Sequence, residues 1–253
     1  MEVYQEKAII ATNNSIVDNA GATFNRFRND QAFQRGFEAG GRILGQGSLV
    51  LGRYGRTISE APYDSEFELE SAMDQEADLE NWARLNGYWH ADPHAYFKEL
   101  GYKFYGYGGE AQVYTEGDTF VHKICRTGQY DNLIRFIDRI TIQNTLCPEA
   151  FLEVEGFGRD AQSSFVVLLK QRFFRQAHLM DEDEVTLFMR CLGFQKLIED
   201  PYHLVKYFSD TVIVEDLHQG NIWMTGDSNV VIIDAFYRFN SPGLGLGGKF
   251  VFG

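Results

Sequence analysis

Three polar residues late in the chain have the types and the spacing of a site that handles phosphate groups. Asp216 and Asn221 lie five residues apart in a polar stretch, and Asp234 follows an apolar run at 230–233. One carboxylate can orient or deprotonate an attacking hydroxyl group, while an amide and a second carboxylate can hold Mg²⁺ on the phosphates. The spacing indicates phosphoryl-transfer chemistry. The other interpretation is an ordinary hairpin, because the residues at 225–229 are typical of a turn between two strands.

A glycine-rich stretch upstream could close over the phosphates of a nucleotide. It covers residues 106–113, fits the pattern G-x-G-x-x-[GA]-x-V, and lies between two predicted strands rather than between a strand and a helix. The following strand, at 119–124, contains Lys123, which could supply a cation to the α- and β-phosphates. The alternative for Lys123 is an exposed lysine on a strand. The small or apolar positions of the stretch are Gly106, Gly108, Gly109, Ala111 and Val113.

Helices and strands that would position these motifs can be predicted from apolar spacing and boundary residues. Asp92 is a typical N-cap, and Asp181 with Glu184 forms a capping-box pair. The first helix is acidic; we expect a solvated face there, and the alternative is a docking surface for a basic partner. The predicted helices are 64–86, 92–100, about 132–144 and 181–192, and the predicted strands are 119–124, 151–158, 165–169 and 211–214.

The composition is that of a globular protein, with 44% hydrophobic and 15% aromatic residues. There is no apolar run long enough to span a membrane, and the first residues lack the pattern of a signal peptide. Three scattered cysteines (Cys125, Cys147 and Cys191) suit reduced thiols, so we expect a cytoplasmic protein. The net charge of −13 argues against a nucleic-acid partner or an anionic membrane surface, but it permits a local basic groove.

Taken together, the motifs make the chain resemble the protein-kinase-like superfamily. Within it, the chain is most similar to the serine/threonine/tyrosine kinase domain of bacterial and phage polyvalent proteins. Asp216, Leu217 and Asn221 fit the D-L-x-x-x-N core of a kinase catalytic loop. The form Asp-Leu-His-x-Gly-Asn-Ile is also similar to aminoglycoside and choline phosphotransferases. The resemblance covers roughly 96–240 and rests on 101–114, 121–124, 155–158, 215–222 and 233–234.

This resemblance implies an α+β fold with two lobes, a reduced C-lobe and a mainly helical N-terminal extension. The extension is expected at 1–91, where acceptor recognition is a hypothesis, and the kinase-like domain at 92–253. Its N-lobe would cover about 92–170 and its minimal C-lobe about 175–253, with a hinge for adenine at 170–174. The chain ends soon after Asp234, and Ala235 follows it in place of the usual D-F-G sequence, so we expect no activation segment.

The implied function is an ATP- and Mg²⁺-dependent phosphotransferase of a mobile-element type. Asp216 would orient the acceptor hydroxyl, Asn221 and Asp234 would bind Mg²⁺, and Lys123 would hold the α- and β-phosphates under the glycine-rich stretch. The acceptor would be a protein Ser, Thr or Tyr hydroxyl, with a small-molecule hydroxyl as the alternative. A third interpretation is a pseudokinase that binds nucleotide or acts as a scaffold. The oligomeric state is open.

Two departures from the kinase pattern concern charged residues. The helix at 132–144 has the place of the kinase αC helix, whose glutamate normally pairs with the lysine. The available acids are Asp131, Asp138 and, after the helix, Glu149. Before Asp216, the usual His and Arg are replaced by Val214 and Glu215, so control by phosphorylation of an activation segment is not expected.

Overall fold

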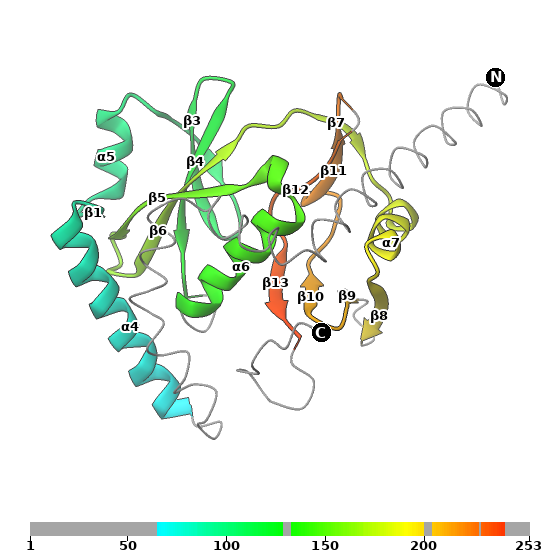
Figure 1. The fold of residues 1–253 in the computed structure, drawn as a ribbon. Coiled ribbons are helices and arrows are strands. Elements are labelled where there is room, and N and C mark those ends of the chain that lie inside the picture. The colour runs from blue at the N-terminus through cyan, green and yellow to red at the C-terminus, as the bar shows by residue number, and fades with distance from the viewer. Residues whose placement is uncertain (1–64, 129–132, 200–203, 228, 241–253) are drawn as a thin grey trace, which may run out of the picture. The chain divides into compact units, whose positions relative to one another are not determined.

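The computed structural model describes residues 65–128, 133–199, 204–227 and 229–240, which are the coloured ribbons of Figure 1. The chain divides into two compact units. The first unit contains the described residues up to 141 together with 151–173. The second contains 142–150 and 174–240. Helix α6 (Leu133–Leu146) contributes residues to both.

A six-stranded sheet forms the frame of the first unit, in the order β1-β5-β6-β4-β3-β2. All neighbours are antiparallel except the short strand β1, which runs parallel to β5. The hairpin of β2 and β3 carries the glycine-rich stretch, and β4 carries Lys123. The strands are β1 (Trp89–His90), β2 (Lys103–Tyr107), β3 (Ala111–Glu116), β4 (Phe120–Arg126), β5 (Leu152–Arg159) and β6 (Phe165–Arg172).

Helices cover both faces of this sheet. Side chains alternate between the two faces along each strand, so every strand contributes side chains to both faces. On one face, Phe97 of helix α5 (Pro93–Glu99) packs on Tyr114, Ile124, Val166 and Leu168. The other face meets α6 and helix α4 (Ser65–Asn86) around a small apolar cavity. That cavity is lined by Leu79, Leu133, Phe136, Ile137, Ile140, Val154, Phe157 and Val167.

The boundaries of α4 and α5 follow local signals, and both helices were predicted at these places. The side chain of Asp92 accepts a hydrogen bond from the Ala95 N–H at 3.0 Å and caps α5. Gly87 ends α4 and Gly101 follows α5 with φ values of +77° and +82°, a conformation that glycine adopts without strain.

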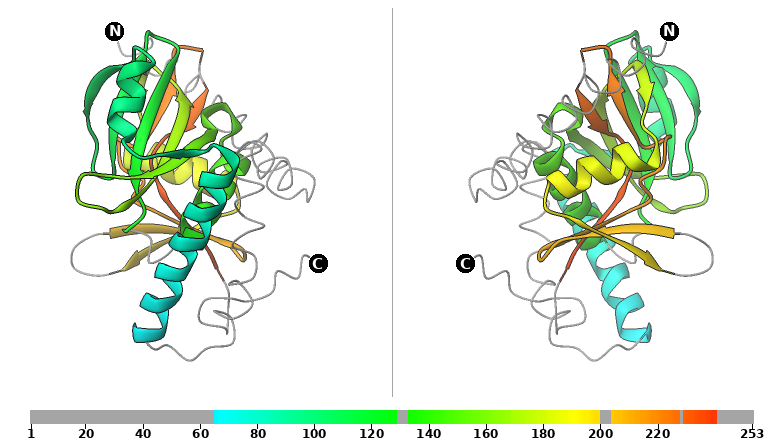
Figure 2. Two further views of the ribbon diagram at one scale, coloured as in Figure 1. Left: turned by 90° about the vertical axis from the view of Figure 1, so that its left-hand side faces the viewer. Right: turned by 90° about the vertical axis from the view of Figure 1, so that its right-hand side faces the viewer.

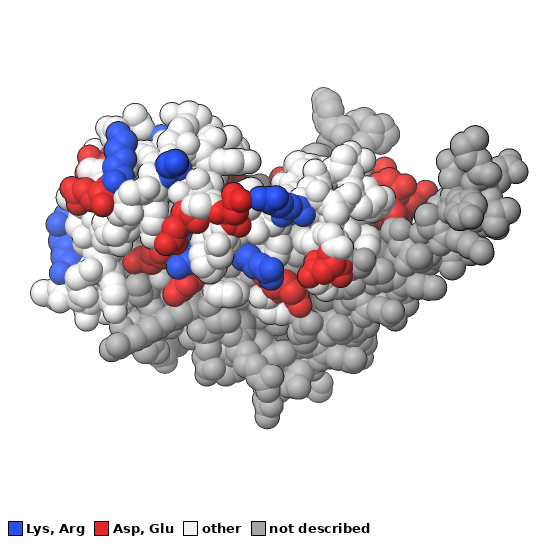
Figure 3. Space-filling view, turned by 90° about the horizontal axis from the view of Figure 1, so that it is seen from above, with Lys and Arg blue, Asp and Glu red and all other residues white. Residues whose placement is uncertain are grey.

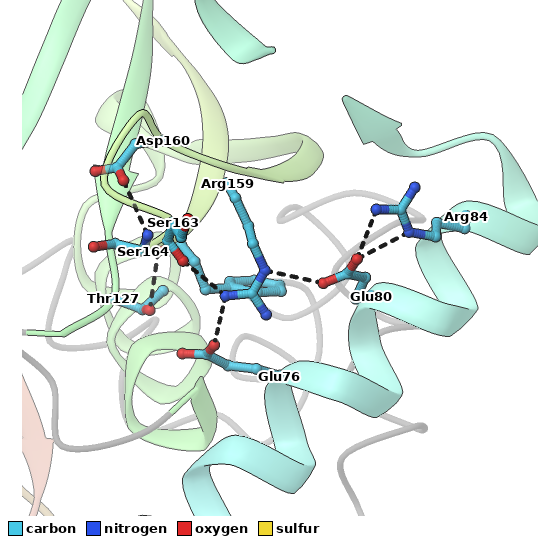
Figure 4. Close-up of polar contacts among 9 residues, drawn as sticks. Glu76, Glu80, Arg84, Thr127, Arg159, Asp160, Ser163 and Ser164 are labelled. Atoms are coloured by element: carbon cyan, nitrogen blue, oxygen red, sulfur yellow. Dashed lines mark hydrogen bonds and ion pairs between the residues drawn. The ribbon is translucent and has the colours of Figure 1, made fainter. Parts of the chain in front are cut away.

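Ion pairs fasten α4 to the end of β5, as Figure 4 shows. Arg159 donates to Glu80 at 3.1 Å, to Glu76 at 3.2 Å and to the Ser163 carbonyl at 2.9 Å. Glu80 also accepts from Arg84 at 2.7 Å within the helix. The expectation of a fully solvated acidic face is therefore wrong for these two glutamates, which bind a strand arginine. Figure 2 shows α4 as a long helix whose N-terminal end extends beyond the strands on which it packs.

Two small antiparallel sheets form most of the second unit, in the orders β13-β10-β9-β8 and β12-β11-β7. Helix α7 (Glu182–Cys191) packs with them in one apolar core, and its N-terminus has the predicted capping box between Asp181 and Glu184. A short 3-10 helix, η1, covers Pro148–Ala150. The strands are β7 (Gln176–Leu179), β8 (Gln195–Glu199), β9 (Leu204–Phe208), β10 (Val212–Glu215), β11 (Ile222–Thr225), β12 (Val230–Ile232) and β13 (Phe236–Phe239).

This mixed architecture, with four α-helices among the described residues, is compatible with a kinase-like fold. The predicted strands at 119–124, 151–158, 165–169 and 211–214 all exist. The predicted hinge at 170–174 begins too early, because β6 continues to Arg172 through ladder hydrogen bonds with β4. Residues 1–64, which make up most of the expected N-terminal extension, lie outside the described residues. In the described part of the chain, no helix has the length and apolarity to cross a membrane.

Candidate active site

A tight polar loop connects β10 to β11 and contains Asp216 and Asn221. Asp216 has a φ of +62°, in the left-handed region, which Asp tolerates better than most residues. The backbone then turns through hydrogen bonds from His218 N–H to the Asp216 carbonyl (3.1 Å) and from Asn221 N–H to the His218 carbonyl (2.8 Å). The loop is therefore fixed by its own backbone, with a polar residue at each end.

The side chains of Asn221 and Asp216 are joined directly. Asn221 Nδ2 donates to both the Asp216 carbonyl (2.9 Å) and the Asp216 carboxylate (3.0 Å). Asn221 is buried, whereas 47% of the Asp216 side chain is exposed. Because the amide nitrogen faces Asp216, the amide oxygen Oδ1 faces away and remains available as a metal ligand, while Asp216 stays accessible from solvent.

The pairing of β11 with β12 brings Asp234 to the same loop. Ile222 lies opposite Ile232, and Ile233 N–H donates to the Asn221 carbonyl at 2.9 Å. Asp234 directly follows this bond, so the two predicted metal ligands come from neighbouring chain segments. One amide oxygen and one carboxylate fit Mg²⁺, which proteins usually bind through one or two carboxylates together with substrate phosphates. Among the residues described, no three His, Cys, Asp and Glu side chains gather as a metal cluster.

His218 is a polar residue of this loop to which the sequence assigned no role. Its Nδ1 accepts a hydrogen bond from Gly220 N–H at 2.9 Å, so the neutral ring carries its proton on Nε2. Nε2 lies 3.7 Å from the Asp216 carboxylate. In the sequence, only the position of His218 two residues after Asp216 indicates that it lies near the site. The sequence does not show the hydrogen bond from Gly220 that sets the orientation of the His218 ring.

In the first unit, the glycine-rich hairpin and Lys123 lie in one row across the sheet. The register pairs Gly106 with Val113, Val113 with Lys123, and Lys123 with Leu169. Directly opposite residues share a face of a sheet, so Lys123 lies on the α6 face beside Val113. The turn is closed by Gly108 N–H, which donates to the Ala111 carbonyl at 2.8 Å, while Gly109 is exposed.

Lys123 is almost completely buried, with 8% exposed. In the part of the chain that the structure describes, no carboxylate forms an ion pair with it. A buried ammonium group without a counter-ion is costly, so this position favours an anionic ligand. On the face that Figure 3 shows, acidic and basic side chains are interspersed and form no broad basic patch.

The acids expected to pair with Lys123 have other surroundings. Asp138 makes no ion pair with Lys123; burial raises its pKa to about 7, and the nearby Arg135 opposes this rise. Asp131 lies outside the described residues, and Glu149 belongs to η1 in the second unit. The ion pair between lysine and the αC acid therefore stays without support.

Helix α6 instead supplies a cation to the glycine-rich turn. Arg139 is 2% exposed, and its Nη2 lies 3.4 Å from the carboxylate of Glu110. The pair connects the helix to the turn between β2 and β3. The sequence did not predict this ion pair, because the kinase pattern calls for an acid on this helix that would pair with Lys123.

The predicted site residues thus form two groups. Asp216 and Asn221 are bonded to each other in the second unit, where Asp234 follows the segment that is bonded to Asn221, and Lys123 lies with the glycine-rich stretch in the first. A family model described as "Serine/Threonine/Tyrosine Kinase found in polyvalent proteins" matches residues 72–241, a range that includes both groups. A search of curated proteins gives no match.

Proposed function

Because the chain belongs to the serine/threonine/tyrosine kinases found in polyvalent proteins, we propose that it transfers the γ-phosphoryl group of ATP, bound with Mg²⁺, to a protein hydroxyl group. The observation that carries this proposal is the double hydrogen bond from Asn221 Nδ2 to Asp216. This bond restrains the Asp216 carboxylate, which would meet the acceptor, and leaves the Asn221 amide oxygen available for Mg²⁺.

Asp216 is the residue that orients the acceptor hydroxyl and takes its proton. Its carboxylate is half exposed, so an acceptor can reach it, and its bond to Asn221 restricts its rotation. Asn221 Oδ1 and the Asp234 carboxylate are the metal ligands of the proposal. Mg²⁺ held there would neutralise charge on the phosphates during transfer.

Lys123 and the glycine-rich stretch bind the nucleotide in this proposal. The buried ammonium group of Lys123 holds phosphate oxygens, which supply the counter-ion that the described residues do not. The residues at Gly106, Gly108, Gly109, Ala111 and Val113 form a hairpin with little side-chain bulk at its turn. Adenine then lies near the end of β6, where the chain leaves the sheet after Arg172.

A second candidate is a nucleotide-binding module without transfer, a pseudokinase. The absence of an acidic partner for Lys123 in the described residues favours it, because this ion pair is one of the elements that active protein kinases require. Both candidates bind nucleotide, so binding and transfer have to be measured separately.

The test begins with calorimetry of ATP binding, with and without Mg²⁺, for the wild type and for Asp234→Asn. We expect Mg²⁺-dependent binding that Asp234→Asn weakens at least about tenfold, because it removes a charged ligand. Asp210→Asn is the matched control, since Asp210 is exposed and precedes β10 in the same unit. Absence of ATP binding in the wild type would overturn both candidates.

Transfer is then measured with γ-labelled ATP and a mixture of protein acceptors. Asp216→Asn keeps the size of the side chain and should bind ATP normally while losing transfer by about a thousandfold or more. Transfer to small hydroxyl compounds alone would move the assignment to the small-molecule alternative. Normal binding without transfer by the wild type would support the pseudokinase.

A further inference from the structure

Glu215, the last residue of β10, is held by two basic side chains from the neighbouring strands. Its Oε1 lies 2.9 Å from Lys206 Nζ of β9, and its Oε2 accepts from Arg238 Nε of β13 at 3.3 Å. The three residues come from three adjacent strands of one sheet. The next residue after Glu215 is Asp216, so this charged group lies at the point where the loop begins.

The strand register explains why these side chains meet. Glu215 lies directly opposite Lys206, whereas Arg238 lies opposite Ile213, two residues away along β10. All three side chains therefore point to the same face of the sheet. Burial alone would raise the pKa of Glu215, but the bonds and charges of Lys206 and Arg238 outweigh it, and the pKa lies below its usual value. The carboxylate is thus charged in the folded protein.

The ion pairs of Glu215 connect the strands that lead to Asp216 and away from Asp234. Arg238 belongs to β13, the strand that follows Asp234, and Lys206 belongs to β9, which pairs with β10. In ordinary protein kinases the residue before the catalytic Asp is a basic one, and phosphorylation orders the segment after the metal-binding Asp through arginine–phosphate pairs. Here the acid is on the loop strand and the bases are on its neighbours, so the attraction is internal.

We propose that Glu215 is a positioning residue: together with Lys206 and Arg238 it fixes Asp216 and the strand after Asp234, so the site is assembled without any phosphorylation of the chain. This proposal rests on the proposed function. In the proposal, these three residues order the segment after Asp234, as a phosphorylated residue does in ordinary protein kinases.

The test compares Glu215→Gln with Glu182→Gln. Glu182 also forms an ion pair with a lysine in the same unit, at 2.6 Å from Lys196, but on α7 and β8, away from the loop. Glu215→Gln should lower kcat by about tenfold to a hundredfold through misplacement of Asp216, with KM for ATP–Mg²⁺ within about twofold. Glu182→Gln should change neither. Unchanged kcat in a folded Glu215→Gln protein would overturn the proposal.

Two further variants separate positioning from simple loss of stability. Arg238→Gln removes the more exposed cation and should give the same split between kcat and KM. Reversal of all three charges (Glu215→Lys, Lys206→Glu and Arg238→Glu) restores attraction and should recover much of kcat. A reversed protein that is as stable as the wild type but as slow as Glu215→Gln would contradict the proposal.

Hydrogen exchange provides a readout that does not need phosphoryl transfer. In Glu215→Gln the amides of 216–221 and of β13 should exchange faster than in the wild type, while those of α7 should not change. If the amide exchange rates of Glu215→Gln equal those of the wild type, Glu215 is not a positioning residue, whether or not the chain is an active kinase. The phosphate-free wild type, checked by mass spectrometry, should also have full kcat; activation by phosphorylation would overturn the proposal.

Discussion

A side chain at Gly220 in the polar loop would collide with the ring of His218. An added Cβ would lie 2.7 Å from His218 Cε1 and 3.0 Å from Nδ1 of the same ring. Gly220→Ala should therefore push the His218 ring away from Asp216 and slow transfer about tenfold, with a small effect on stability because the loop is exposed. Transfer rate and thermal unfolding are the measurements.

The matched control for this prediction is Gly226→Ala. Gly226 lies in the turn after β11, where nothing is within 4 Å of an added Cβ. This variant should behave like the wild type. Equal rates for the two alanine variants would mean that the position of His218 does not matter for transfer.

At the level of single residues, the sequence predicted the members of the site better than their contacts. The motif predicted that Asp216 and Asn221 share one loop, and they do, because five residues of a tight turn cannot separate them far. The turn of the His218 ring and the pair of Arg139 with Glu110 were not predictable, since each depends on a hydrogen bond or packing that spacing does not specify. The chemical roles of all these residues stay predictions.

Helix α6 contains a carboxyl group that opposes folding at neutral pH. Burial raises the pKa of Asp138 to about 7 from an ordinary value of 3.8. The folded protein thus keeps this proton over a pH range in which the unfolded chain has lost it. The contribution of Asp138 to stability is most favourable near pH 4 and falls as the pH rises towards 7.

Asp138→Asn should accordingly raise the free energy of unfolding at pH 8 by about 2 kcal/mol, a value reduced for the partial exposure of the side chain. Near pH 4 it should have almost no effect. Denaturant unfolding at the two pH values measures this, with Asp210→Asn as an exposed control. A gain of equal size at both pH values would contradict a role for the proton.

Secondary-structure elements with local signals were predicted well, and elements defined by pairing were not. Helices α5 and α7 begin at the predicted caps because Asp92 and Asp181 bond to backbone groups three residues away. Strands β1, β7, β8, β9 and β13 were missed. Each is two to five residues long. Strands β1, β7 and β13 pair with strands that are distant in the chain, and β8 and β9 pair with each other, and β propensity alone indicates neither kind of pairing.

The family match also begins earlier than the resemblance read from the motifs. It starts at residue 72, within α4, rather than near 96. Leu79 and Ala83 of this helix are completely buried, and Arg159 binds two of its glutamates. Helix α4 is therefore part of the first unit, and the division of the chain at 91 and 92 stays a prediction.

For the whole molecule, the net charge of −13 should affect nucleotide binding. Free ATP carries about four negative charges at neutral pH and is repelled by an anionic protein, so affinity without Mg²⁺ should be at least about tenfold weaker. Added salt should narrow the gap by screening the repulsion. Calorimetry with Mg²⁺ or with a chelator, at low and high salt, measures both effects.

Asp234→Asn is the control that separates local from global charge in this experiment. It removes the proposed metal ligand but changes the net charge by only one, so its ATP affinity should lose most of the Mg²⁺ dependence and keep the salt dependence. Equal affinity of the wild type with and without Mg²⁺ would refute the prediction.

The left-handed backbone of Asp216 affects how any inactive variant at this position is interpreted. At a φ of +62°, Asp, Asn and Gly are accommodated, whereas alanine is disfavoured. An alanine at 216 thus alters the path of the chain as well as the carboxylate, and its phenotype mixes two causes. In a saturation library, selection for folding should retain Asp, Asn and Gly, and selection for transfer should retain Asp alone. The difference between the two selections isolates the contribution of the carboxylate.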